Sequence, residues 1–364
     1  MSLQNRKICG IILLLRVCVY GSPDLCFKER IIMNRRERVL AALHFEKTDF
    51  TPYQIGFTGQ MYEKMKAYAG EEFFGRIRNH LVQTDLIKPQ ITVGPELSMD
   101  EYGVVWNKSG ADKDIGVIDA IRLRDPADLA SFELPPVDEA FVRGKMEELM
   151  AVADDRFRIA GIGFSLFERA WTLRGMENLL CDMMAEPDFV HELLGKITKR
   201  NLEIIDIALD YDFDGFYFGD DWGQQKGLIM GPRCWREFIK PRLAEMYGRV
   251  RGAGKYVVQH SCGDVRDIMD DLYEVGLNMY NTFQPEIYGY DYAKKIDGRI
   301  TIWGGISTQR DLPVKTPDGI RTVTKELLAA FPHGGLVAAP THDIPGDARP
   351  ENIEAMLDVL EHQN

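Results

Sequence analysis

The stretch GFYFGDDWGQQKGLIMGPRCWREFIKPRLAEMYGRVRGAGKYVVQHSCG, residues 215–263, contains the unit that decides the fold. It begins with a short apolar run, continues through a stretch of helical character from Arg233 to Val250, and returns to a second apolar run. Near-continuous apolar runs joined through a helix are typical of neighbouring parallel strands, because such strands are buried on both faces. The stretch therefore predicts one strand–helix–strand unit of an α/β fold.

The same alternation extends in both directions along the chain. The further apolar runs are FRIAGIGFS (157–165), NMYNTFQ (278–284), TIWGGIS (301–307) and GLVAAPTH (335–342), with YQIGF (53–57) and LIKPQITVG (86–94) before them. With the two runs of the first unit these make eight strands, so we expect a (β/α)8 TIM barrel. An open doubly wound sheet is the second expectation, and it is weakened because no glycine-rich dinucleotide fingerprint follows an early strand. A first helix after Asn34 and a hairpin region within residues 86–124 are expected as N-terminal elaborations.

Composition excludes several classes of partner. The chain has 364 residues and a formal net charge of −12, which argues against binding to nucleic acid or to anionic membranes. Its cysteines do not form the spacing of a disulfide framework, which favours a reducing, cytoplasmic setting. The cysteines are Cys9, Cys18, Cys26, Cys181, Cys234 and Cys262.

The N-terminal segment has a basic start and an apolar run that superficially resembles a signal peptide. Arg16 interrupts this run, no small-residue cleavage site follows, and the run is shorter than the roughly 20 residues of a membrane span. We therefore expect residues 1–32 to be an extension outside the fold, and residues 33–364 to be a single domain.

Polar residues follow the apolar runs, at the end of a barrel where chemistry is expected. His260 and Cys262 are two residues apart at a strand end, so their side chains point to the same side. His342 ends the last predicted strand and is the best candidate for a third ligand. Two histidines and one thiolate suit a catalytic zinc ion, which keeps a fourth position open. The alternative is structural: a buried cysteine that packs as a small hydrophobe and histidines that hydrogen-bond to loops.

The paired aspartates that follow GFYFG have two interpretations. Adjacent strand residues face opposite sides, so only one of Asp220 and Asp221 can point into the barrel mouth, where it would act as a catalytic acid or base. The alternative is a helix N-cap. We expect Trp222, Phe164 and Gln284 to shape the substrate pocket.

Five stretches together resemble the uroporphyrinogen decarboxylase superfamily. They are GIGFSLFERAWTLRGMENLL (161–180), DDWGQQKGLIMGPRCWREFIKPRL (220–243), HSCGDVRDIMDDLYEVGLNMYNTFQPE (260–286), GGISTQRDLP (304–313) and GGLVAAPTHDIPGDARPENIEAM (334–356). Within it, the chain is more similar to the corrinoid-linked methyltransferases than to the decarboxylase, whose arginine-bearing motif is missing from residues 51–75. Those methyltransferases bind zinc through His-x-Cys and a later cysteine. His260 and Cys262 match the first two positions, whereas His342 stands in place of the cysteine.

The resemblance implies a zinc-dependent methyltransferase that moves a methyl group between a corrinoid, carried by a partner protein, and a small thiol or methoxylated substrate. The alternative it implies is cofactor-free decarboxylation of uroporphyrinogen, and a third hypothesis is a corrinoid-protein binding subunit without catalysis. The resemblance leaves a homodimer open.

Overall fold

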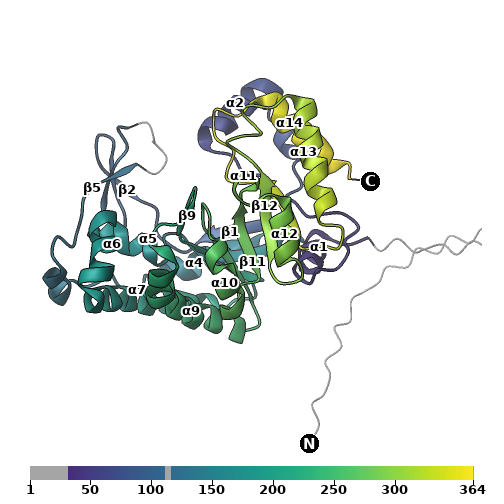
Figure 1. Ribbon diagram of the computed structural model, residues 1–364. Coiled ribbons are helices and arrows are strands. Elements are labelled where there is room, and N and C mark those ends of the chain that lie inside the picture. Colours follow the sequence, from purple (N-terminus) through teal and green to yellow (C-terminus); the bar gives the residue numbers. More distant parts are fainter. Residues whose placement is uncertain (1–31, 111–115, 364) are drawn as a thin grey trace, which may run out of the picture. The chain divides into compact units, whose positions relative to one another are not determined.

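The main sheet consists of seven strands, each parallel to its neighbours, in the order β1-β6-β7-β10-β11-β12-β13 (Figure 1). The computed structural model describes residues 32–110 and 116–363. Strands β11, β12 and β13 are buried along their whole length, as a sheet covered on both faces requires. The strands are β1 (Leu81–Asp85), β6 (Phe157–Ile162), β7 (Gly215–Gly219), β10 (Tyr256–His260), β11 (Met279–Phe283), β12 (Thr301–Ile306) and β13 (Leu336–Pro340).

Helices connect successive strands, and the helix predicted from Arg233 to Val250 is confirmed as α8 with α9. A π-helical turn, Trp235–Ile239, joins α8 to α9. The helices are α1 (Arg35–Leu43), α2 (Gly59–Ala69), α3 (Glu72–Arg76), α4 (Glu139–Ala151), α5 (Phe167–Arg174), α6 (Met176–Ala185), α7 (Pro187–Ala208), α8 (Gly231–Cys234), α9 (Lys240–Gly252), α10 (Met269–Val275), α11 (Pro285–Tyr288), α12 (Tyr290–Ile296), α13 (Pro317–Ala330) and α14 (Pro350–Glu361).

The predicted eighth strand, YQIGF, forms only two isolated parallel bridges, Tyr53 to Ala338 and Phe57 to Ile344. The backbone of this segment nevertheless contacts both edges of the sheet. Gln54 N donates to the carbonyl of Ala338 in β13, and His80 N, just before β1, donates to the carbonyl of Tyr53. The sheet is therefore curled so that its edges approach one segment, but the closed eight-stranded barrel is not confirmed.

The strand predicted at LIKPQITVG was wrongly placed along the sequence. The main-sheet strand ends at Asp85, and Ile91–Gly94 instead forms β2 of a separate antiparallel sheet with β3 (Leu97–Met99), β4 (Val105–Asn107) and β5 (Val117–Ala120). Pro89 lies between the two strands and belongs to neither, in agreement with its lack of the N–H that a residue inside a strand donates. This small sheet confirms the hairpin elaboration. A two-stranded ribbon, β8 (Gly223–Gln224) with β9 (Gly227–Leu228), follows β7.

Helix α1 lies at the amino ends of the strands. It begins as predicted at Asn34, whose side chain accepts from Glu37 N in a capping box. Its Arg36 pairs at 2.7 Å with Asp214, the residue before β7. The carboxyl ends of the strands lie at the opposite side of the sheet, where active sites of α/β barrels are found.

The proposed extension, residues 1–32, lies outside the described residues except for Ile32, so its boundary stays a prediction. Among the helices of the described part of the chain, none is long and apolar enough to cross a membrane.

Candidate metal centre

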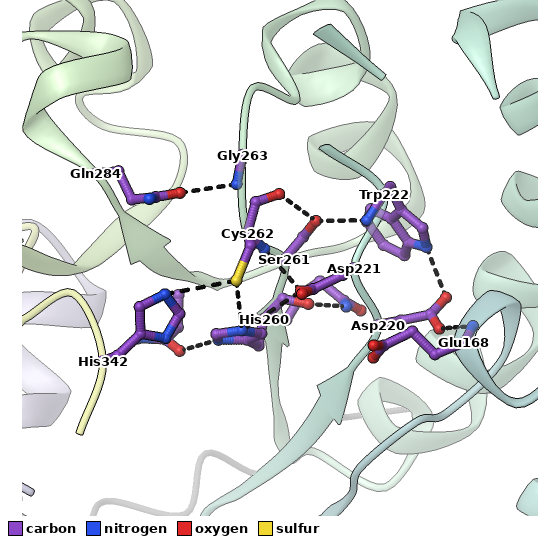
Figure 2. Close-up of polar contacts among 12 residues, drawn as sticks. Glu168, Asp220, Asp221, Trp222, His260, Ser261, Cys262, Gly263, Gln284 and His342 are labelled. Atoms are coloured by element: carbon purple, nitrogen blue, oxygen red, sulfur yellow. Dashed lines mark hydrogen bonds and ion pairs between the residues drawn. The ribbon is translucent and has the colours of Figure 1, made fainter. Parts of the chain in front are cut away.

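Three side chains that are distant in sequence converge at the carboxyl ends of the strands (Figure 2). Cys262 Sγ lies 3.5 Å from His260 Nε2, at the end of β10, and 3.5 Å from His342 Nε2, two residues after β13. The three potential ligand atoms lie within 4.8 Å of one another. The structure thus brings together the three residues that the sequence predicted as ligands.

The separations of these atoms fit a zinc ion. With Zn–S near 2.3 Å and Zn–N near 2.0–2.1 Å, tetrahedral angles place a nitrogen and a sulfur ligand about 3.5 Å apart. Both nitrogen–sulfur distances of the cluster have this value. Two imidazoles and one thiolate also leave a fourth position for a substrate, as catalytic zinc sites do.

Asn281, in β11, orients the ring of His260. Its Oδ1 lies 2.5 Å from His260 Nδ1, and its Nδ2 donates to the carbonyl oxygen of Trp303 at 3.3 Å. Because the Trp303 carbonyl can only accept, the amide oxygen must face the imidazole, and His260 Nδ1 must carry the proton. The free lone pair is then on Nε2, the nitrogen beside Cys262. This is the tautomer that a metal-binding histidine needs.

Replacing Asn281 by alanine is expected to weaken zinc binding by about 10–100-fold, the usual cost of losing a partner that orients a ligand. The measurement is the zinc dissociation constant by competition with a chromophoric chelator. Asn281→Asp, which keeps an acceptor for His260 Nδ1–H, should retain affinity. Equal affinities for all three proteins would contradict this role.

The protonation states of the cluster suit metal binding. Burial, followed by the neighbouring His260, lowers the pKa of His342 to about 4, so its imidazole is neutral at pH 7. Burial, followed by the charge of Asp221, raises the pKa of the Cys262 thiol. A thiol in this setting ionises only with a compensating cation, which a divalent metal ion supplies.

The two paired aspartates have different surroundings. Asp220 is fully buried, and its carboxylate accepts hydrogen bonds from Leu166 N (3.2 Å), Phe167 N (3.0 Å), Glu168 N (2.7 Å) and Trp222 Nε1 (2.6 Å). Burial raises its pKa to about 6, against the effect of these four donors. The carboxylate is thus occupied in capping the amino end of α5, not the later helix considered from the sequence, and no contact supports the catalytic role predicted for it.

Asp221 faces the metal cluster. Its Oδ1 accepts from Cys262 N at 2.8 Å and lies 3.5 Å from His260 Nε2, and its side chain is 34% exposed. Asp220 and Asp221 point in opposite directions, as strand alternation predicts, and only Asp221 lies beside the metal cluster. Its catalytic role stays a prediction.

Trp222 and Gln284 are occupied by contacts with the protein. Trp222 is fully buried and its backbone N–H donates to Ser261 Oγ at 2.9 Å. Gln284 is also buried, and its Oε1 accepts from Gly263 N at 2.7 Å. Both residues hold the loop that carries Cys262, and their predicted substrate contacts gain no support from these partners.

The loops after β7 and β10 touch at two glycines. Gly263 has φ +78°, and a Cβ there would lie 2.3 Å from the carbonyl carbon of Gly223. Only glycine permits this close approach, which places Asp221 beside Cys262.

A chamber of about 610 Å³ opens beside the cluster. Its walls include His260, His342 and Asn281, together with several residues that the sequence analysis did not identify as site residues. The other lining residues are Gln54, Gly56, Thr58, Gln83, Asp85, Tyr217, Trp303, Ala339, Pro340, Thr341 and Asp343. For most of these residues the sequence offered only their position relative to the strands. Asp85 is the last residue of a strand, and Tyr217 and Trp303 lie within strands.

Phe164 lines a second, more apolar cavity of about 720 Å³. Its ring lies 5.7 Å from that of Trp106 and 6.2 Å from that of Trp171, measured between centroids. Glu168 lines the same cavity, and burial, followed by the charge of Asp221, raises its pKa well above the usual range. Sequence reasoning missed Glu168, although it lies within a quoted motif.

Comparison with known proteins identifies the family and the fold of the chain. The model of a family described as uroporphyrinogen decarboxylase (URO-D) matches residues 112–363. A curated uroporphyrinogen decarboxylase from Chloroherpeton thalassium is 21% identical over 258 residues, covering 66% of this chain and 70% of that protein. A solved methyltransferase from Methanosarcina mazei is 18% identical with a TM-score of 0.66, covering 91% of this chain and 99% of that one, which shows a shared fold. Because the family model covers more than half of its length, the chain belongs to the uroporphyrinogen decarboxylase family.

Proposed function

We propose that this protein is a zinc-dependent methyltransferase that moves a methyl group between a corrinoid, carried by a partner protein, and a small thiol or methoxylated substrate. The observation that carries the proposal is the convergence of His260, Cys262 and His342 with the separations of a tetrahedral zinc site. The fold shared with the Methanosarcina mazei methyltransferase supports the reaction class.

The residues around the cluster have defined tasks in this proposal. His260, Cys262 and His342 would hold the zinc ion, which when bound activates a substrate heteroatom as a Lewis acid. Asp221 takes up the proton that a thiol loses as it becomes a nucleophile, because its carboxylate is partly exposed and adjoins the cluster. Asn281 keeps His260 in the required tautomer.

Decarboxylation of a porphyrinogen is the second candidate, favoured by the similarity to a curated uroporphyrinogen decarboxylase. The chamber gives it less support, because its lining contains no lysine or arginine to neutralise a substrate with eight carboxylates. The arginines of helix α1 do not fill this role, because Arg35, Arg36 and Arg38 are each paired with an aspartate of the protein itself. Turnover of uroporphyrinogen by metal-free protein would favour this candidate.

The proposal is tested by measuring zinc in the purified protein and methyl transfer before and after chelation. Methylcobalamin serves as the corrinoid probe and 2-mercaptoethanol as the thiol, with demethylation followed by the absorbance of cobalamin. We expect about one equivalent of zinc per chain, and a rate that falls on chelation and returns with added zinc. A protein that neither contains nor binds zinc would refute the proposal.

A further inference from the structure

The chamber beside the metal cluster carries negative charge without cationic partners. Its lining contains the carboxylates of Asp85 and Asp343 and no lysine or arginine. Asp343 makes no hydrogen bond or ion pair with any other described residue, and Asp85 accepts hydrogen bonds only from backbone amides, among them Ile87 N at 2.9 Å. Both residues are exposed to the chamber, so their charges face whatever binds there.

A glycine at residue 56 leaves room for the carboxylate of Asp343. A Cβ at residue 56 would lie 1.9 Å from Asp343 Oδ1. The side chain of Asp343 can therefore keep its present position in the chamber wall only with glycine at residue 56. Burial is the largest influence on the pKa of Asp85 and raises it, against the smaller opposing charge of Arg169, which does not line the chamber.

Two aromatic rings form another part of the wall. The rings of Tyr217 and Trp303 meet edge to face, with centroids 6.3 Å apart, and both line the chamber. The Tyr217 hydroxyl has no hydrogen-bond partner in the described part of the chain, and burial raises its pKa well above the usual range, so it stays a neutral phenol. Aromatic faces combined with carboxylates are the recognition chemistry of ammonium groups.

We propose that the small-molecule substrate of this chamber carries a quaternary or protonated ammonium group. The carboxylates of Asp85 and Asp343 balance its charge, and the rings of Tyr217 and Trp303 contact its alkyl groups. This inference rests on the proposed function, since it assigns the substrate class of the same site.

Charge distinguishes this class from acidic or neutral substrates. A zinc ion with its thiolate adds a single net positive charge, which does not cancel the carboxylates of Asp85 and Asp343. An anionic substrate would meet uncompensated carboxylates in a partly enclosed space, where repulsion is weakly screened. A cation meets attraction from the same groups and from the ring faces.

The test compares choline with its neutral isostere 3,3-dimethylbutan-1-ol and with the anion 2-methoxyethanesulfonate by titration calorimetry on the purified protein of known zinc content. We expect choline to bind about tenfold more tightly than the isostere, and the anion to bind most weakly. Asp85→Asn and Asp343→Asn should each lower the affinity for choline and leave that for the isostere unchanged, which also shows that the variants are folded. Asp347→Asn, an exposed aspartate outside the chamber lining, is the matched control and should change neither.

Equal binding of choline and the isostere, or tighter binding of the anion, would overturn the inference. This outcome is independent of zinc content, so it would leave the proposed methyltransferase function standing. A protein without zinc that still prefers choline would refute the proposed function and keep the charge preference of the chamber.

Discussion

Replacing Cys262 by alanine is expected to raise the zinc dissociation constant by more than about a hundredfold, beyond the usual effect of losing a residue that only orients a ligand. Cys262 lies between the two imidazoles, with Sγ at 3.5 Å from each Nε2 atom, and it is the only cluster residue able to supply a negative charge to the ion. The measurement is metal content after dialysis together with competition against a chromophoric chelator.

Two variants separate a ligand role from a general loss of structure. Cys234→Ala removes a half-buried thiol at the end of α8, outside the cluster, and should keep full zinc content. His342→Cys replaces one zinc ligand type by another and should also retain the metal. Wild-type affinity in the Cys262→Ala protein would show that the three side chains do not form the binding site.

Much of the fold follows from local pattern. The apolar runs from residue 157 onward became strands of one parallel sheet, and the helix predicted from Arg233 to Val250 formed between two of them. The strand near residue 86 was misplaced because an apolar run around Pro89 outweighed the more polar sequence of β1, LVQTD. YQIGF formed only bridges because its pairing depends on the distance between the sheet edges, which no local signal encodes.

Site residues were predictable from the sequence only where their spacing along a strand fixes the direction of their side chains. His260 and Cys262 are two residues apart at one strand end, so their common direction follows from strand geometry. The contribution of Asn281 depends on β11 lying beside β10 with Asn281 opposite His260. That of Asp85 depends on β1, which is not a neighbour of β10, lining the same chamber, and this information exists only in the assembled sheet. The contrast between Asp220 and Asp221 was foreseen as an alternation, but the helix that Asp220 caps was not.

Replacing Asp220 by alanine is expected to lower the free energy of unfolding by about 4 kcal/mol, because four buried donors lose one charged acceptor. Three of these donors are backbone amides at the start of α5, and the fourth is the indole of Trp222. None can reach solvent easily, since Asp220 and Trp222 are fully buried. A loss of this size is a large part of the stability of an ordinary domain, which is about 5–15 kcal/mol. Urea denaturation followed by circular dichroism measures it.

The neighbouring residue provides the matched control. Asp221→Ala removes a partly exposed carboxylate with one backbone hydrogen bond, to Cys262 N, and should cost about 1 kcal/mol. The pair therefore separates the structural role of Asp220, in the stability of the loop and α5, from that of Asp221, which we propose acts in methyl transfer. Equal unfolding midpoints for the two variants would contradict the capping role of Asp220, because the hydrogen bonds of its buried carboxylate would then contribute no more than those of the partly exposed Asp221 side chain.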